Sequence, residues 1–406
     1  MNETKPSEHS QPRLSQSQLW VLTLASAVVT ANAYYIHPII ARVAEHFQVS
    51  STEIGIVPAS NQLALAVGIF FLLPLGDRVS NRTLTAIFVT GQFFGMLLMA
   101  LAQSFELFVL GSTLLGFLTI APYLLPAYAS KRVDPAELGR VTAVLTTGII
   151  AGILMARAGA GVIAEYFGWR TVYYIATGLM LVVAILLPLS MDRREKPSSD
   201  TPSTPYLALL ASLWPLIRRY PEILLSGSIQ GLNFGIFISI WLGLGLHLTS
   251  PEMGYGVDTV GYLALLAVIN LFTAPRFGVW ADKVGARKAR AIFASIQLIG
   301  VSLFLFLGHS LLLLIIPIII TKMFGPVIDV SSRMTFLNED RDVRTRLMTV
   351  FIVFMFVGGG LASWAGTAAY DAWGWTGNAV LALVTSITVL CLCLYAHVRH
   401  KRAEQV

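Results

Sequence analysis

Long apolar runs alternate with short polar connections along almost the whole chain. Each run holds 20 to 27 residues, and the runs cover about 19–43, 53–76, 83–103, 105–128, 141–166, 171–190, 222–248, 258–281, 289–308, 310–331, 346–370 and 377–397. A helix needs about 20 mostly apolar residues to cross a bilayer. The pattern therefore predicts an all-α integral membrane protein with twelve transmembrane helices.

Composition narrows the class of protein further. Of the 406 residues, 12% are charged and 55% are hydrophobic, whereas roughly a quarter of an ordinary soluble domain is charged. These values exclude a disordered, collagen-like or disulfide-scaffold protein and argue against a soluble enzyme. The two cysteines, Cys391 and Cys393, lie in the last apolar run with no acidic residue nearby, so we expect neither a disulfide framework nor a metal site.

Basic residues gather on one side of the predicted spans. With the N-terminus placed in the cytoplasm, 23 of the 28 Lys and Arg residues lie on the cytoplasmic side, and only Arg42 and Arg170 lie on the other. The positive-inside rule then predicts a multi-pass membrane protein with both termini in the cytoplasm. The net charge of +6 is explained by topology, and we expect no nucleic-acid partner.

A polar segment divides the chain in the middle. It begins with charged, Ser- and Pro-rich sequence typical of a flexible linker, and it ends with an apolar stretch over 206–217 that is too short to span a bilayer. We expect this stretch to lie along the cytoplasmic interface. The predicted segments are a tail over 1–18, a six-helix bundle over 19–190, the linker over 191–221, a second six-helix bundle over 222–397 and a tail over 398–406.

The two halves share an internal repeat. Short motifs of the first half recur in the second at offsets of 204 to 206 residues: Asp77-Arg78 with Arg82 matches Asp282-Lys283 with Arg287, Ala121-Pro122 matches Gly325-Pro326, Arg140-Val141 matches Arg346-Leu347, and Gly168-Trp169 matches Gly374-Trp375. Two duplicated helical halves predict a transporter whose site lies between them near the membrane midplane.

The loop over 278–288 resembles the loop signature of the major facilitator superfamily, and the likeness extends over the whole chain. It implies two pseudo-symmetric six-helix bundles, transport by alternating access and a monomer. It also implies that the acidic residue of each loop meets basic side chains and a helix end of its own half, closing the cytoplasmic side. On this chain the implied gate residues are Asp77, Arg78, Arg82, Asp282 and Arg287. The alternative is that these charges serve topology alone.

The fifth apolar run is similar to an antiporter motif of the same superfamily, most closely to bacterial drug:proton antiporters. Gly148 and Gly152 are present, but Ala156-Arg157 stands where the motif has Gly-Pro. Independently of the family, small residues at four-residue spacing predict that this helix packs closely against a neighbour.

Charges inside the apolar runs give the strongest indication of a site. None of the 22 acidic residues lies near the centre of a run, whereas Arg157, Arg276 and Lys322 lie inside runs. A charge in lipid is costly and is a functional candidate by default. Arg276 can reach the cytoplasmic surface or join the gate, and Lys322 either pairs with Asp329 or contacts solute. Arg157 is far from both ends of its helix, which favours solute binding or coupling over a structural role.

Uncharged polar residues at similar depth complete the predicted substrate cavity, although each alone is more often a contact between helices. They are Asn32, Tyr35, Gln62, Gln230, Asn233 and Asn270. His37 is the titratable group near the midplane that changes charge around neutral pH, so it is the proton-coupling candidate; a neutral, hydrogen-bonded histidine is the alternative.

The resemblance to bacterial drug:proton antiporters implies export of a small organic solute in exchange for protons across the plasma membrane, the bacterial inner membrane. The charge inventory favours an anionic or a polar, neutral solute. A lipophilic cation would need a negative charge in the site. Two other functions within the same fold remain open: an importer or facilitator of a sugar or organic acid, and a multidrug exporter of cations. The chain carries no His-Glu-x-x-His, no paired intramembrane carboxylates and no nucleotide-binding loop, so we expect neither an enzyme nor a cofactor.

Overall fold

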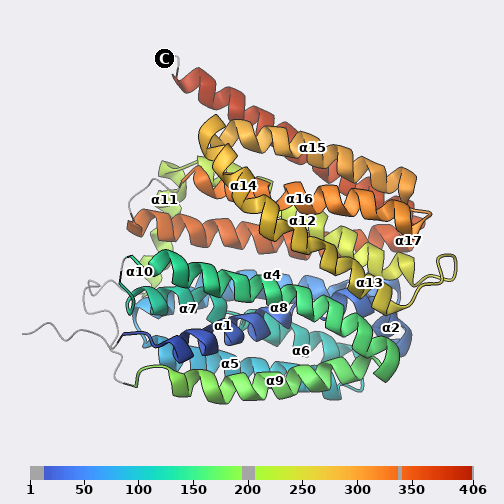
Figure 1. Ribbon diagram of the computed structural model, residues 1–406, viewed down its shortest axis with the longest axis horizontal. Coiled ribbons are helices and arrows are strands. Elements are labelled where there is room, and N and C mark those ends of the chain that lie inside the picture. The colour runs from blue at the N-terminus through green and yellow to red at the C-terminus, as the bar shows by residue number, and fades with distance from the viewer. Residues whose placement is uncertain (1–12, 135, 194–205, 337–340, 405–406) are drawn as a thin grey trace, which may run out of the picture.

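In the computed structural model, which describes residues 13–134, 136–193, 206–336 and 341–404, the described chain is helical and contains no strand. The first half forms α1 (Gln16–Ala31), α2 (Ile36–Phe47), α3 (Ser51–Ile54), α4 (Ile56–Leu72), η1 (Leu73–Asp77), α5 (Asn81–Leu101), α6 (Phe105–Phe117), α7 (Ala121–Ser130), α8 (Leu138–Phe167) and α9 (Trp169–Ser190). The second half forms α12 (Glu222–Leu248), α13 (Val257–Ala264), η2 (Leu265–Val268), α14 (Ile269–Val284), α15 (Ala286–Leu307), α16 (Leu311–Met334) and α17 (Arg341–Glu404). The halves form two bundles that lie side by side (Figure 1).

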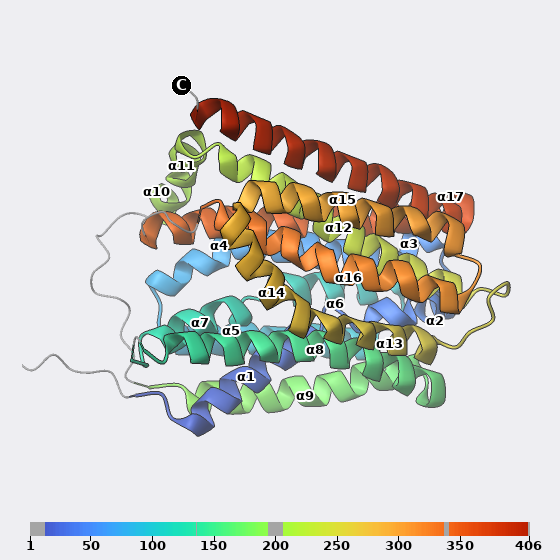
Figure 2. The ribbon, with the colours of Figure 1, turned by 45° about the horizontal axis from the view of Figure 1, so that its top comes forward.

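The predicted twelve-helix fold is confirmed. Eleven described segments are long and apolar enough to cross a membrane, and the last of them, Arg346–Lys401, is 56 residues long. It holds two passes, because the backbone of α17 leaves helical geometry at Trp373 and at Gly374, whose φ of 58° suits a glycine. The chain reverses direction at this point and returns to the end where its C-terminus lies (Figure 2).

Two short helices, α10 (Tyr206–Ala211) and α11 (Leu213–Arg219), join the halves at one end of the bundles, which we call the linker end; the opposite end is the far end. The Tyr206 hydroxyl donates a hydrogen bond to the carbonyl of Phe71, and Leu213 is buried between the halves. The remainder of the predicted linker, 194–205, and most of the predicted tail, 1–12, lie outside the described residues.

Close helix contacts depend on the predicted small residues. A Cβ on Gly152 would collide with the Ala27 carbonyl of α1, and one on Gly358 would collide with the backbone of Gly231. These contacts bring α8 against α1, and α17 against α12. The glycines thus set the spacing of helices that line the interface between the halves.

Candidate solute-binding site

The first membrane span is broken halfway along its length. Helix α1 ends at Ala31, α2 begins at Ile36, and the four residues between them form turns. The N–H of Tyr34 donates to the carbonyl of Ala31, three residues back rather than four. This tighter turn places Tyr34 at the same depth as the buried charges of the neighbouring helices.

Arg157 of α8 is almost fully buried, with 1% of its surface exposed. Its guanidinium carbon lies 4.9 Å from the ring centre of Tyr34, 4.6 Å from that of Phe237 and 4.9 Å from that of Trp241. Its Nε and Nη2 are buried without a hydrogen-bond partner among the described residues. The aromatic faces therefore stabilise a cation that no described carboxylate neutralises.

Lys322 of α16 shares two of these rings. Its ammonium nitrogen lies 3.8 Å from the ring centre of Phe237 and 4.5 Å from that of Trp241. The alternative that Lys322 pairs with Asp329 is wrong, because the Asp329 carboxylate instead accepts a hydrogen bond from Nε of Arg333 at 3.0 Å. Arg333 is one helical turn from Asp329, whereas Lys322 is two turns away.

Sharing Phe237 places the two cations close together, at most about 8 Å apart, where like charges repel. No described acidic side chain forms an ion pair with either one. Cation–π contacts contribute about 2 kcal/mol each when desolvated, which is less than a buried counter-ion supplies. The geometry leaves a cluster of buried positive charge between the two bundles, with no described carboxylate paired to it.

His37 lies one side chain away from this pair. It is fully buried, its ring meets the Tyr34 ring edge to face at 5.2 Å, and both ring nitrogens lack a hydrogen-bond partner among the described residues. Since Tyr34 also contacts Arg157, a positive charge on His37 would lie one ring away from that of Arg157 and be repelled by it.

The uncharged candidates divide into two groups. Gln230 and Asn233 are engaged with neighbouring helices: the Asn233 amide donates to the Gln230 side chain and the Gly325 carbonyl, and it accepts from Gln297 of α15. This network lies one turn toward the linker end from Phe237, so it borders the cluster and serves helix packing.

The second group carries buried polar atoms without a described partner. Both amide atoms of Asn32, and the side-chain oxygens of Gln62 and Asn270, are of this kind. Tyr35 is buried in the break of the first span. Their role in binding solute stays a prediction.

Tyr34, Phe237 and Trp241 surround the two cations, and the sequence did not single them out. Phe237 and Trp241 are four residues apart and share one face of α12. An aromatic pair at this spacing is ordinary in an apolar helix, so no signal separates it from lipid-facing neighbours.

At the far end, side chains close the seam between the halves. The Glu165 carboxylate at the end of α8 accepts a hydrogen bond from the Val257 N–H at the start of α13, at 3.0 Å, and lies 3.8 Å from the guanidinium of Arg42. Below them, a Cβ on Gly161 would lie 3.0 Å from the Cα of Gly261. Contacts this close seal the far end above the cation pair.

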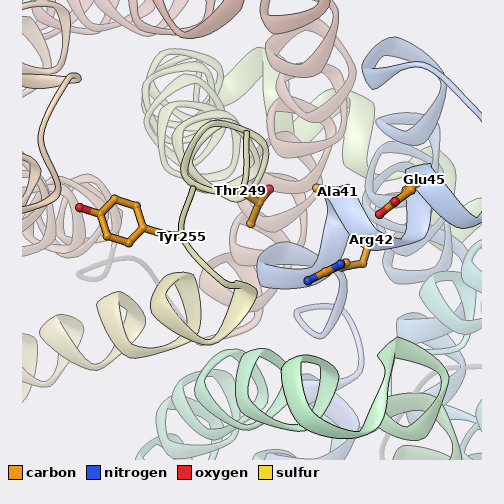
Figure 3. Close-up of a pocket in the computed structure, with 5 residues that line it drawn as sticks. All are labelled: Ala41, Arg42, Glu45, Thr249 and Tyr255. Carbon is orange, nitrogen blue, oxygen red and sulfur yellow. The ribbon is translucent and has the colours of Figure 1, made fainter. Parts of the chain in front are cut away.

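A second link and a small hollow lie near this seam. The Thr52 hydroxyl donates to the Asp371 carboxylate at 2.8 Å, again between the halves. The hollow measures about 140 Å³ and is lined by Ala41, Arg42, Glu45, Thr249 and Tyr255, with Tyr255 pointing away from the other four (Figure 3). Because it lies at the far-end surface, it is separate from the buried cluster.

Comparison with known proteins identifies the family. The model described as Major Facilitator Superfamily matches residues 22–340. The chain belongs to this superfamily. It is 29% identical over 387 residues to the uncharacterized transporter YgaY of Escherichia coli O157:H7, covering 94% of this chain and 96% of YgaY. It is 24% identical to the multidrug resistance protein MdtG of Escherichia coli SMS-3-5, covering 87% and 86% of the two chains.

Solved structures agree on the fold. The nucleoside transporter NupG superposes with a TM-score of 0.76 at 13% identity, covering 93% of this chain and 99% of NupG. A bacterial homologue of the lysosomal transporter Spinster, in an inward-facing and unoccupied conformation, gives 0.75 at 15% identity, with 94% and 96% covered. The protein is a multi-pass membrane transporter of the superfamily.

The loop charges of this superfamily member lie at the linker end. Nε of Arg82 donates to the carbonyl of Pro188 near the end of α9, at 2.8 Å. In the second half Arg287 pairs with Glu222 at 3.3 Å, whereas Asp282 is exposed and forms no ion pair with a described residue. The Asp77 side chain lies outside what the structure describes, and Arg78 lies over the Tyr206 ring. Their role as a gate stays a prediction.

Two further basic residues complete this description. Arg290 was not predicted; it is fully buried, donates to the Ser226 hydroxyl at 2.9 Å and lies 3.7 Å from Glu222. Arg276 is exposed and donates to the Phe272 carbonyl on its own helix. Arg290 therefore ties α15 to α12, while Arg276 takes no part in a described ion pair.

Proposed function

We propose that this transporter exports small organic anions in exchange for protons. One observation carries the proposal: Arg157 and Lys322 are buried against the same two rings, with no described carboxylate paired to either. A negatively charged solute is the partner that such a site lacks. A lipophilic cation would add a third positive charge to it.

Export is supported by energetics and by a relative. A membrane potential that is negative inside drives an anion outward, by about 2.3 kcal/mol per charge per 100 mV. MdtG carries a multidrug-resistance name. The positive-inside rule makes the linker end cytoplasmic. His37, beside Tyr34 and Arg157, is the group that we assign to proton coupling.

Ligand-induced thermal stabilisation of the purified protein in detergent tests the anion assignment. The panel contains small aliphatic and aromatic carboxylates, neutral amides of the same acids, and tetraphenylphosphonium as a lipophilic cation. The variants are Arg157→Ala and, as matched control, Arg276→Ala, since Arg276 also lies in a span but contacts neither ring. We expect carboxylates to raise the melting temperature of the wild type and of Arg276→Ala by a few degrees, and to leave Arg157→Ala unchanged.

Two outcomes would contradict the proposal. If tetraphenylphosphonium stabilises the wild type and Arg157→Ala equally, the site takes cations and Arg157 is structural. If neutral amides stabilise as well as their parent acids, charge is not what the site recognises. The direction of transport is tested separately in proteoliposomes. There a proton gradient should drive the anion in the direction opposite to the proton flux.

A further inference from the structure

We infer that the transported anion carries two negative charges. This inference rests on the proposed function and specifies its substrate class. It follows from the pairing of Arg157 and Lys322 on the Phe237 and Trp241 rings rather than from either cation alone. A monoanion neutralises one buried cation. Two cations that lie close together away from water need a dianion to be neutralised.

Because the two cations are buried, any positive charge that the ligand leaves unmatched is costly. Arg157 is 1% exposed and Lys322 is 5% exposed, so water screens neither of them well. A monoanion would leave one positive charge unmatched in this environment, and electrostatic interactions there are stronger than at a surface. No described carboxylate is available to compensate that charge. Asp329 pairs with Arg333, and Glu165 contacts Val257 and Arg42.

Arg157 and Lys322 offer the groups that such a ligand needs. Nε and Nη2 of Arg157 are buried donors without a described partner, on a planar group suited to bidentate contact with a carboxylate. Lys322 adds a compact positive charge from the opposite bundle. A dianion would therefore bridge α8 of the first half and α16 of the second, and binding it would join the halves.

Calorimetric titration of matched acids tests the inference. The probes are succinate and glutarate, their half-amides succinamate and glutaramate, and sulfate, which carries both charges on one centre. We expect at least one dianion to bind the wild type roughly 30-fold or more tightly than the monoanions. In Arg157→Gln and in Lys322→Gln this preference should fall to within about threefold, while Lys322→Arg, which keeps the charge, should retain it.

The outcomes separate the inference from the proposed function. Equal affinity for succinate and succinamate in the wild type would overturn the dianion inference while leaving anion transport intact. Failure of every anion to bind would overturn both. Preference for sulfate over the dicarboxylates, or the reverse, supports the inference and decides whether the two charges sit on one group or on two. The wild-type comparison is decisive even if a variant fails to fold.

Discussion

Glu165 of the first half accepts a hydrogen bond from the backbone N–H of Val257 in the second half, across the seam that closes the far end. Arg42 lies within 3.8 Å of the same carboxylate and fixes its charge in place. The bond can exist only while the two bundles are together at this end. Glu165 therefore stabilises one of the two conformations that alternating access requires.

Replacing this carboxylate should favour opening of the far end. Glu165→Gln weakens a charge-assisted hydrogen bond, and we expect about 1 kcal/mol of lost closure, a roughly fivefold shift in population. Distances between spin labels at Gln103 and His309, exposed at the far end of either half, report the change. Glu106→Gln, an exposed far-end carboxylate within one half, is the control; an identical distance distribution in both variants would refute the assignment.

A single methyl group in the seam should have a larger effect. A Cβ on Gly161 would lie 2.6 Å from the Val257 carbonyl oxygen, whereas a Cβ on Gly159 meets nothing within 4 Å. Gly161→Ala should hold the far end apart and slow transport several-fold, and Gly159→Ala, with the same gain in helix propensity, should not. Initial rates in proteoliposomes measure this. Equal rates for the two variants would mean that the seam does not need to close so tightly.

Coupling to protons should depend on His37. Its ring is buried against Tyr34. His37→Gln keeps a polar side chain at this place but removes the group that can take up a proton. We expect anion transport driven by a pH gradient to disappear while anion exchange at equal pH persists. His309→Gln, in the exposed far-end connection, is the control. Gradient-driven transport that survives in His37→Gln would exclude His37 as the coupling group.

Arg290 should contribute to stability rather than to transport. It is fully buried, donates a hydrogen bond to Ser226 and lies near Glu222, which also pairs with Arg287. Arg290→Gln removes this hydrogen bond from a charged donor and should lose about 2 kcal/mol of unfolding free energy, seen as a lower melting temperature. Lys288→Gln, an exposed basic residue two positions earlier, should melt like the wild type. A variant at Arg290 that melts normally would show that Arg287 alone is enough for Glu222.

The sequence predicts the spans well because the bilayer demands long apolar runs, and it predicts Arg157 because a charge stands out against such a run. It does not predict the rings around Arg157. The chain holds 22 Phe, 13 Tyr and 8 Trp, and helical spacing cannot say which of them face the other bundle. Phe237 and Trp241 became visible only when α12 was placed against α8 and α16.

Two local features show the same limit. The break at residues 32–35 falls inside an apolar run with no glycine, so hydropathy alone does not mark it. The local signal is Pro38, which has no N–H to bond to the Tyr34 carbonyl and whose ring clashes with it. Asp329 has two basic residues on its own helix, Arg333 one turn away and Lys322 two turns away. It pairs with the nearer one, Arg333. In both cases the sequence gives the residues but not which contact they make.

The rings of Phe237 and Trp241 also bear on the half of the transport cycle in which no anion is carried. In the proposed exchange the carrier returns with a proton in place of the anion, and bare charges in a low-dielectric interior would oppose that return. Because the π faces remain against Arg157 and Lys322 after the anion has left, they lower the cost of this step. Net movement of anion, as opposed to one-for-one swapping of anions across the membrane, depends on that return.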